Sequence, residues 1–158
     1  QLIAMKDLGK QQKDALDLFF HKEAKKQGKK IIGLEKMIEQ IDAINSIPYK
    51  NQAQELVAAV HKAMNSTENE IESLIDFYIQ GDLDTLLTIT TQYDSINNEY
   101  NAIIKDVFIL KRNVNMADRC EKHLKENSTF IAIGAAHLPG ENGVIELLRK
   151  KGYKVVAN

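Results

Sequence analysis

The chain has 158 residues, 44% of them hydrophobic, a length and composition that fit one domain with an ordinary core. Its formal net charge of −1 gives no overall attraction to nucleic acid or to an anionic membrane, and nucleic acid is not expected as a partner. Because Cys120 is the only cysteine, the chain can form neither an intramolecular disulfide nor a cysteine-based zinc site. The sequence has no run of about 18 apolar residues that could span a membrane.

The charge is unevenly distributed along the chain. Residues 65–100 hold eight acidic side chains and no Lys or Arg, whereas the flanking residues hold all 21 basic side chains and the other 14 of the 22 acidic ones. An acidic helical region of this kind either guides a basic substrate or forms an ordinary solvated face.

The N-terminal part is predicted to form a helix followed by a short strand. Residues 8–27 carry apolar side chains at the spacings of three and four that a helix requires, and Gly28 is typical of a helix end. Residues 30–34 are rich in isoleucine and leucine, which favours a short strand that ends directly before Glu35.

The middle of the chain is predicted to be almost wholly helical. Pro48 suits the first turn of a helix, Gly81 is typical of a helix end, and Asp82 is a typical N-cap. Thr67 and Glu70 have the spacing of a capping box. The predicted helices are residues 36–46, a helix from Pro48, a helix from Thr67 to Gly81, residues 83–92 and residues 94–127. Within the last of these we expect Cys120 to be a small buried residue and not a nucleophile.

The C-terminal part is predicted to contain a strand, a helix and a second strand. Residues 129–135 are mostly apolar, and they lead into a turn that contains His137. Residues 141–151 have the pattern of a short amphipathic helix, and residues 153–157 have that of a strand. His137 is therefore expected where a strand leaves a sheet and a helix begins, which is a common ligand-binding position in α/β proteins.

These elements predict an α/β fold that is predominantly helical around a small sheet. If the strands that end at Glu35 and Gly134 are parallel, both ends lie at one edge of the sheet. The carboxylate of Glu35 and the imidazole of His137 can then share a divalent metal, or serve as a ligand and a general base. The alternative for Glu35 is a carboxylate at a helix N-terminus, stabilised by the dipole of the helix predicted at residues 36–46.

Two further residues are candidates for the same chemistry. Glu141 acts either as a catalytic acid or base, or as a first-turn carboxylate that interacts with a helix dipole. Arg112 carries a fixed fork of donors that suits a carboxylate or a polarised carbonyl oxygen. Its alternative is a structural salt bridge with Asp106, with Asp118 or with a carboxylate at the sheet edge.

Four short motifs follow one another in a particular order along the chain. They are Leu16-Asp17-Leu18-Phe19-Phe20, Gly28-Lys29-Lys30-Ile31-Ile32-Gly33-Leu34-Glu35, Arg112-Asn113-x-x-Met116-Ala117, and the run from Phe130 to Val155 that contains Gly134-Ala135-Ala136-His137. In content and order they resemble the motifs of the TraB/GumN family, relatives of the Tiki proteases, and the last one contains a G-x-x-H motif. The sequence departs from the family at Lys111, where the family often has Glu.

The resemblance implies a metal-dependent hydrolase, most concretely a peptidase, that uses Mn²⁺ or Co²⁺ and acts on a peptide or protein substrate. It implies that His137 ligates the metal and that Glu35 is a second ligand or the general base. By the same resemblance Arg112 stabilises a developing oxyanion.

The family also has an earlier G-x-x-H motif that this sequence lacks. We therefore expect residues 1–158 to be a single domain, the C-terminal part of a longer protein whose N-terminal half supplies the second histidine. By itself this part is expected to bind the metal weakly and to be inactive. The bacterial members of the group suggest the cell envelope or periplasm. The alternative function is a non-catalytic, envelope-associated binding or regulatory protein on the same scaffold.

Overall fold

The computed structural model describes residues 15–65, 70–91 and 98–157. The chain divides into two compact units, Gln1–Gly33 and Leu34–Asn158. The described helix of the first unit is α2 (Leu16–Lys26), and the beginning of the helix predicted at residues 8–27 lies outside the described residues. Gly28, with a φ of 63°, ends α2 as the sequence predicts.

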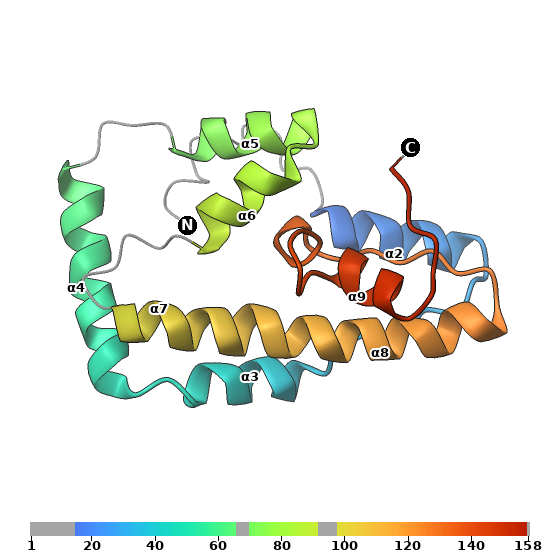
Figure 1. The fold of residues 1–158 in the computed structure, drawn as a ribbon, viewed down its shortest axis with the longest axis horizontal. Coiled ribbons are helices and arrows are strands. Elements are labelled where there is room, and N and C mark those ends of the chain that lie inside the picture. The colour runs from blue at the N-terminus through green and yellow to red at the C-terminus, as the bar shows by residue number, and fades with distance from the viewer. Residues whose placement is uncertain (1–14, 66–69, 92–97, 158) are drawn as a thin grey trace. The chain divides into compact units, whose positions relative to one another are not determined.

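Helices and turns make up the regular structure of the second unit where it is described. They are α3 (Met37–Asn45), α4 (Tyr49–Asn65), α5 (Glu70–Gln80), α6 (Leu83–Thr91), α7 (Asn98–Ile104), the π-helical segment η1 (Lys105–Leu110), α8 (Lys111–Glu126), the 3₁₀ turn η2 (Ala135–His137) and α9 (Val144–Lys150). Helix α7, η1 and α8 follow one another without a break, and together they form one long helix (Figure 1). Helix α3 contacts η1, and α9 contacts α8.

The helix boundaries in the second unit agree with the signals in the sequence. Helix α4 begins directly after Pro48, and Gly81, with a φ of 69°, follows the end of α5. Asp82 caps α6, because its carboxylate accepts hydrogen bonds from the backbone N–H of Thr85 at 3.0 Å and from the Thr85 hydroxyl at 2.6 Å. These predictions are confirmed, whereas the capping box that begins at Thr67 falls mostly on residues outside the described part of the chain. No helix of the described chain is long and apolar enough to cross a membrane.

The predicted sheet is absent from the described residues, so the expectation of an α/β fold is wrong and the described chain is helical. The segments expected to be strands, which end at Glu35 and Gly134 or begin at Tyr153, are irregular. Four of their large apolar side chains are exposed. The exposed fractions are 44% for Ile31, 45% for Ile32, 72% for Phe130 and 65% for Val156.

The physical reason for this error lies in what a strand requires. Apolar and β-branched residues favour a strand only where a neighbouring strand pairs with the backbone and another layer covers the side chains. Residues 129–135 and 153–157 have no paired strand in the described chain, and side chains such as Phe130 and Val156 are exposed. The last segment is held instead by the Arg149 guanidinium, whose Nη2 donates to the Val155 carbonyl at 2.8 Å. Glu35 and His137 are therefore not placed by a sheet edge.

One stripe of α8 forms a large part of the core of the second unit. Met116, Ala117 and Cys120 are buried, and Val144 at the start of α9 is buried as well. Burial raises the pKa of the Cys120 thiol, which keeps it protonated. The prediction that Cys120 is a small buried residue is confirmed.

Arg119 of α8 fixes the segment that leads into α3. Its guanidinium donates to the Leu34 carbonyl and to both carboxylate oxygens of Glu39, of which the bond from Nη1 is 2.9 Å long. Glu39 also accepts a hydrogen bond from the backbone N–H of Lys36 at 2.7 Å, as in a capping box. These bonds lower the pKa of Glu39 to about 2. The segment between Leu34 and Lys36, which carries Glu35, is thus held at both of its ends.

The turn before α9 is closely packed. A Cβ atom on Gly140, whose φ is 83°, would lie 2.8 Å from the Cδ2 atom of Leu87 in α6. A Cβ atom on Gly143 would lie 2.2 Å from the Pro139 carbonyl oxygen. Since that neighbour is backbone, the turn cannot make room for a side chain at Gly143 without moving.

Gly143→Ala should destabilise the fold, because the added methyl group collides with the Pro139 carbonyl. We expect the free energy of unfolding in urea to fall by about 1–3 kcal/mol or more. Asn142→Ala is the matched control, because the Asn142 side chain is exposed and its backbone is unchanged by the substitution. Equal stability of the Gly143→Ala variant and the wild type would show that the turn is looser than described.

Glu39→Gln should reduce the sensitivity of the fold to acid. The folded pKa of about 2 lies below the ordinary value of 4.5, so the ionised carboxylate contributes stability that is complete above about pH 4.5 and is lost as the pH falls toward about 2. The variant should melt at a lower temperature than the wild type near neutral pH, and the two should converge at about pH 2. Glu126→Gln, at an exposed position on α8, is the control and should follow the wild type. If the melting temperatures of Glu39→Gln and the wild type changed with pH in the same way, the proposed contribution of the pair Arg119–Glu39 to stability would be contradicted.

Candidate functional site

Arg112 and Glu35 form a bidentate ion pair. Arg112 lies in the first turn of α8, and its Nε and Nη2 atoms donate to the two carboxylate oxygens of Glu35 at 2.7 and 2.6 Å. Both side chains are largely shielded from water, with exposed fractions of 22% for Arg112 and 10% for Glu35. The bonds to Arg112 lower the pKa of Glu35 against the opposing effect of burial, so the carboxylate stays ionised.

The π-helical segment lies directly before this arginine. The backbone N–H of Lys111 bonds to the Asp106 carbonyl, five residues back, which is the spacing of a π-helix. The Phe108 carbonyl accepts a hydrogen bond from Arg112 Nη1 at 3.3 Å. The widened turn therefore supplies a third contact that orients the guanidinium.

His137 is held by Asn113, the residue next to Arg112. The Nδ1 atom of His137 lies 2.7 Å from Oδ1 of Asn113, and the side chains are buried, with exposed fractions of 8% and 1%. The Asn113 Nδ2 group donates to the Asn142 carbonyl at 2.8 Å. One asparagine thus connects α8 both to η2, which carries His137, and to the turn before α9.

The two pairs lie within electrostatic reach of each other. Burial and the positive charge of Arg112 lower the pKa of His137, and the negative charge of Glu35 acts against them. The imidazole is consequently neutral near pH 7, which is the form that binds metals. The structure brings together three of the residues that the sequence singles out: Glu35, Arg112 and His137.

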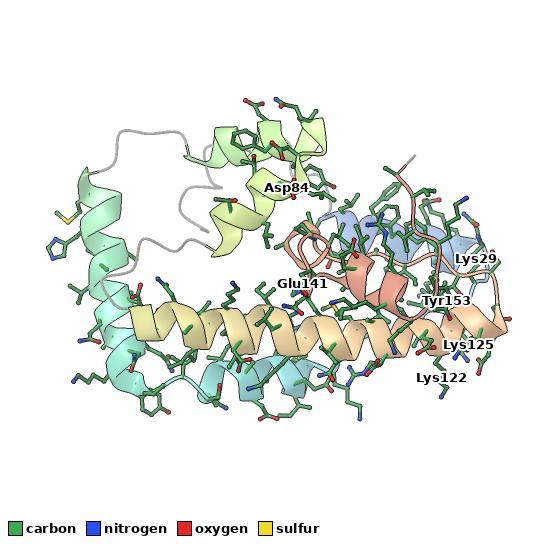
Figure 2. The ribbon with its side chains drawn as sticks, viewed as in Figure 1. Lys29, Asp84, Lys122, Lys125, Glu141 and Tyr153 are labelled. Carbon is green, nitrogen blue, oxygen red and sulfur yellow. The ribbon has the colours of Figure 1, made fainter. Side chains whose placement is uncertain are left out.

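Glu141 does not belong to this cluster. Its side chain is 86% exposed, and its Oε1 atom lies 3.8 Å from Nζ of Lys150 in α9. The Lys150 ammonium also donates to the Glu141 backbone carbonyl at 3.1 Å. Figure 2 shows Glu141 in the turn that precedes α9. Glu141 lies before the first residue of α9, and its contacts are with Lys150 in the last turn of that helix, so they favour neither interpretation of this residue.

Sequence reasoning missed the part that Asn113 plays. The signal was present, because Asn113, Met116, Ala117 and Cys120 follow the spacing of a buried helical stripe, and all four are buried. A polar residue within such a stripe needs partners for its side chain. Its partners lie 24 and 29 residues away in the sequence, so the spacing alone does not identify them.

The described side chains do not form a metal site by themselves. They include no group of three or more His, Cys, Asp and Glu residues placed to hold an ion. Among the described residues the Nε2 atom of His137 has no hydrogen-bond partner, because the ring makes its contact with Asn113 through Nδ1. A neutral imidazole with one uncommitted nitrogen fits a metal ligand. Glu35 is a carboxylate whose oxygens each accept one hydrogen bond from Arg112.

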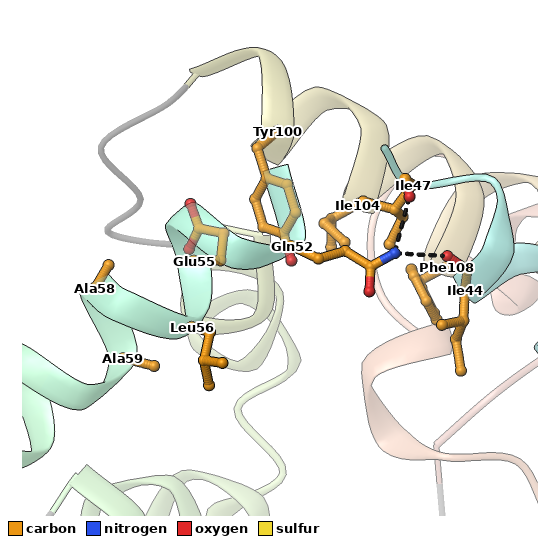
Figure 3. Close-up of a pocket in the computed structure, with 10 residues that line it drawn as sticks. All are labelled: Ile44, Ile47, Gln52, Glu55, Leu56, Ala58, Ala59, Tyr100, Ile104 and Phe108. Atoms are coloured by element: carbon orange, nitrogen blue, oxygen red, sulfur yellow. Dashed lines mark hydrogen bonds between the residues drawn. The ribbon is translucent and has the colours of Figure 1, made fainter. Parts of the chain in front are cut away.

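A separate apolar groove lies between α3, α4, α7 and η1 (Figure 3). Its volume is about 570 Å³. Gln52 crosses one end of it and donates from Nε2 to the Ile47 carbonyl at 2.8 Å. The residues that line the groove are Ile44, Ile47, Gln52, Glu55, Leu56, Ala58, Ala59, Tyr100, Ile104 and Phe108. None of the residues Glu35, Arg112, Asn113 and His137 lines this groove.

The sequence is similar to those of several known proteins. The chain is 29% identical over 162 residues to the metalloprotease TIKI1 of Danio rerio, which covers 89% of this chain and 33% of that protein. It is 30% identical over 167 residues to the metalloprotease TIKI2 of Xenopus tropicalis, with 89% and 31% covered, and 26% identical over 167 residues to the metalloprotease TIKI1 of Homo sapiens, with 89% and 32% covered. The chain therefore spans about a third of the length of these curated relatives. No solved structure matches the chain.

A family model extends over nearly the whole sequence. The model described as the TraB/PrgY/gumN family matches residues 1–157. This match covers the segments that carry Glu35, Arg112 and His137, and it confirms the resemblance that the four sequence motifs indicate. The chain belongs to the TraB/PrgY/gumN family.

Proposed function

We propose that this chain forms part of a metal-dependent hydrolase that cleaves peptides or proteins. The observation that carries the proposal is the buried, neutral imidazole of His137, which is anchored through Nδ1 and lies within electrostatic reach of the ion pair between Glu35 and Arg112. The names of the relatives, which are metalloproteases, support the same reaction class. Because the chain spans about a third of those relatives, the activity is proposed for the whole protein.

In this proposal His137 would hold a divalent metal, Mn²⁺ or Co²⁺, with Nε2 as its donor atom. The remaining ligands would come from a part of the protein outside this chain, with a histidine of a second G-x-x-H motif as the expected partner. When bound, the metal lowers the pKa of a water molecule and polarises the substrate carbonyl. Asn113 and η2 hold the imidazole in place and thereby set the direction of Nε2.

Glu35 and Arg112 act next to this histidine. Each carboxylate oxygen of Glu35 accepts one hydrogen bond from Arg112 and retains acceptor capacity for a metal or for a water molecule. Its lowered pKa weakens it as a general base, which favours a role as ligand or as acceptor for the attacking water. Arg112 uses three of its five N–H groups in its contacts with Glu35 and Phe108, and two remain for a developing oxyanion.

A second candidate function is a non-catalytic binding or regulatory protein on the same scaffold, associated with the cell envelope. The observation that favours it is the apolar groove of about 570 Å³ beside η1. The helices around the groove expose further apolar side chains, among them Leu56 at 66% and Ile44 at 49%. Such a surface suits a protein partner. Here the ion pair between Arg112 and Glu35 would serve the fold alone.

His137→Ala should reduce peptide hydrolysis by the intact protein to background. The assay is cleavage of a peptide library with added Mn²⁺ or Co²⁺, at a temperature where melting curves show the variant folded. Because the substitution leaves the buried Oδ1 of Asn113 without its partner, we also expect a loss of about 1–3 kcal/mol in the free energy of unfolding. His123→Ala, on α8, removes a histidine away from the cluster and should retain activity. Turnover by His137→Ala equal to that of the wild type would reject the metallohydrolase.

Glu35→Gln should lower the turnover of the intact protein by about 100-fold, because the uncharged amide is a weaker ligand for a cation and a weaker acceptor for the attacking water than the carboxylate. The variant also removes the ion pair with Arg112, because the NH₂ group of the glutamine amide then faces a guanidinium donor. The free energy of unfolding should therefore fall by about 1.5–3 kcal/mol. Glu141→Gln is the control and should keep both turnover and stability, because that side chain is exposed.

The two variants also separate the two candidate functions. Loss of stability in Glu35→Gln without loss of turnover would assign the ion pair to the fold alone. If the folded wild-type protein cleaves no peptide with either metal, the binding or regulatory function takes the place of the hydrolase.

A further inference from the structure

The amide of Asn113 has only one orientation that satisfies its surroundings. One end of the amide lies 2.8 Å from the backbone carbonyl of Asn142, and the other end lies 2.7 Å from Nδ1 of His137. A carbonyl oxygen only accepts hydrogen bonds, so the NH₂ group of Asn113 must face Asn142. The amide oxygen must therefore face the imidazole ring.

This orientation determines which imidazole nitrogen carries the proton. An amide oxygen accepts hydrogen bonds and cannot donate one, so Nδ1 of His137 must be the donor. In a neutral imidazole the other nitrogen is then unprotonated. We infer that Asn113 is a positioning residue that holds His137 in the tautomer with the proton on Nδ1, and so leaves the lone pair of Nε2 available to an incoming cation or proton.

Burial of both side chains supports the assignment of the proton to Nδ1. Asn113 is 1% exposed and His137 is 8% exposed, so water cannot replace either partner at little cost. Histidine free in water favours the opposite tautomer, with the proton on Nε2, and the fold therefore has to impose the one described here. The hydrogen bond to the Asn142 carbonyl keeps the amide from turning over, and that carbonyl lies in the closely packed turn before α9.

The inference on the tautomer concerns the fold of this chain, and its use in ligand binding rests on the proposed function. The first test is nuclear magnetic resonance of the intact protein with ¹⁵N-labelled histidine, at about pH 8, above the usual pKa of histidine. In the wild type, Nδ1 of His137 should show the chemical shift of a protonated ring nitrogen and Nε2 that of an unprotonated one. The reverse assignment in the wild type would overturn the inference without any variant.

Variants of two asparagines on α8 then test whether the Asn113 amide is what sets the tautomer of His137. Asn113→Ala should shift His137 toward the tautomer protonated on Nε2. Asn113→Asp retains an acceptor oxygen and should keep the proton on Nδ1. Asn115→Ala removes the same group from an exposed position on the same helix and should leave the spectrum unchanged. A spectrum of folded Asn113→Ala identical to that of the wild type would overturn the inference.

Calorimetric titration of the metal-free intact protein with Mn²⁺ or Co²⁺ tests the use of this tautomer. Asn113→Ala should weaken metal binding by about 10–100-fold, which is the usual effect of removing a residue that hydrogen-bonds a metal-bound histidine. Asn115→Ala should leave metal binding unchanged. Wild-type affinity in folded Asn113→Ala would overturn the positioning role. If the wild type binds neither metal but carries the proton on Nδ1, the proposed function fails and the inference on the tautomer stands.

Discussion

Arg112 and Asn113 are adjacent on α8, and each holds one of the side chains on which the proposed chemistry depends. Arg112 binds both oxygens of Glu35, and Asn113 binds the ring of His137. Successive residues on a helix point about 100° apart, so one turn reaches two segments that are distant in the sequence. Since neither segment forms a strand in the described chain, side-chain hydrogen bonds do the positioning that strand ends do in α/β proteins.

Arg112 has opposite effects on the charge of the two side chains beside it. Arg112 keeps Glu35 charged by lowering its pKa, and the same positive charge, with burial, keeps His137 neutral. A charged carboxylate beside a neutral imidazole is the combination that binds a cation, because neither group needs to lose a proton first. The arrangement has a cost for base catalysis, because a carboxylate with a lowered pKa holds a proton weakly.

The sequence predicts the helices well because local interactions determine them. Gly28, Pro48, Gly81 and Asp82 act within a few residues of their own positions, and each lies at the helix boundary expected of it. The predicted strands fail because a strand depends on a neighbour, and apolar residues alone do not supply one. The partners of Arg112 and Asn113 also lie far away in sequence, although their residue types indicate the kind of contact. The sequence thus identifies Glu35, Arg112 and His137 but not the asparagine that connects them.

The π-helical segment η1 gives the long helix a property that none of its α-helical turns has. Its backbone hydrogen bond spans five residues, so it accommodates one residue more than an α-helical turn does. Loss of one residue from an α-helical turn rotates everything beyond it by about 100°. Loss of one residue between Lys105 and Leu110 would instead close the widened turn to an α-helical one and leave α7 and α8 facing nearly as they do now. The contact that depends on the widened turn is the one between Arg112 Nη1 and the Phe108 carbonyl, so the turn matters for the orientation of the guanidinium more than for the direction in which α8 faces.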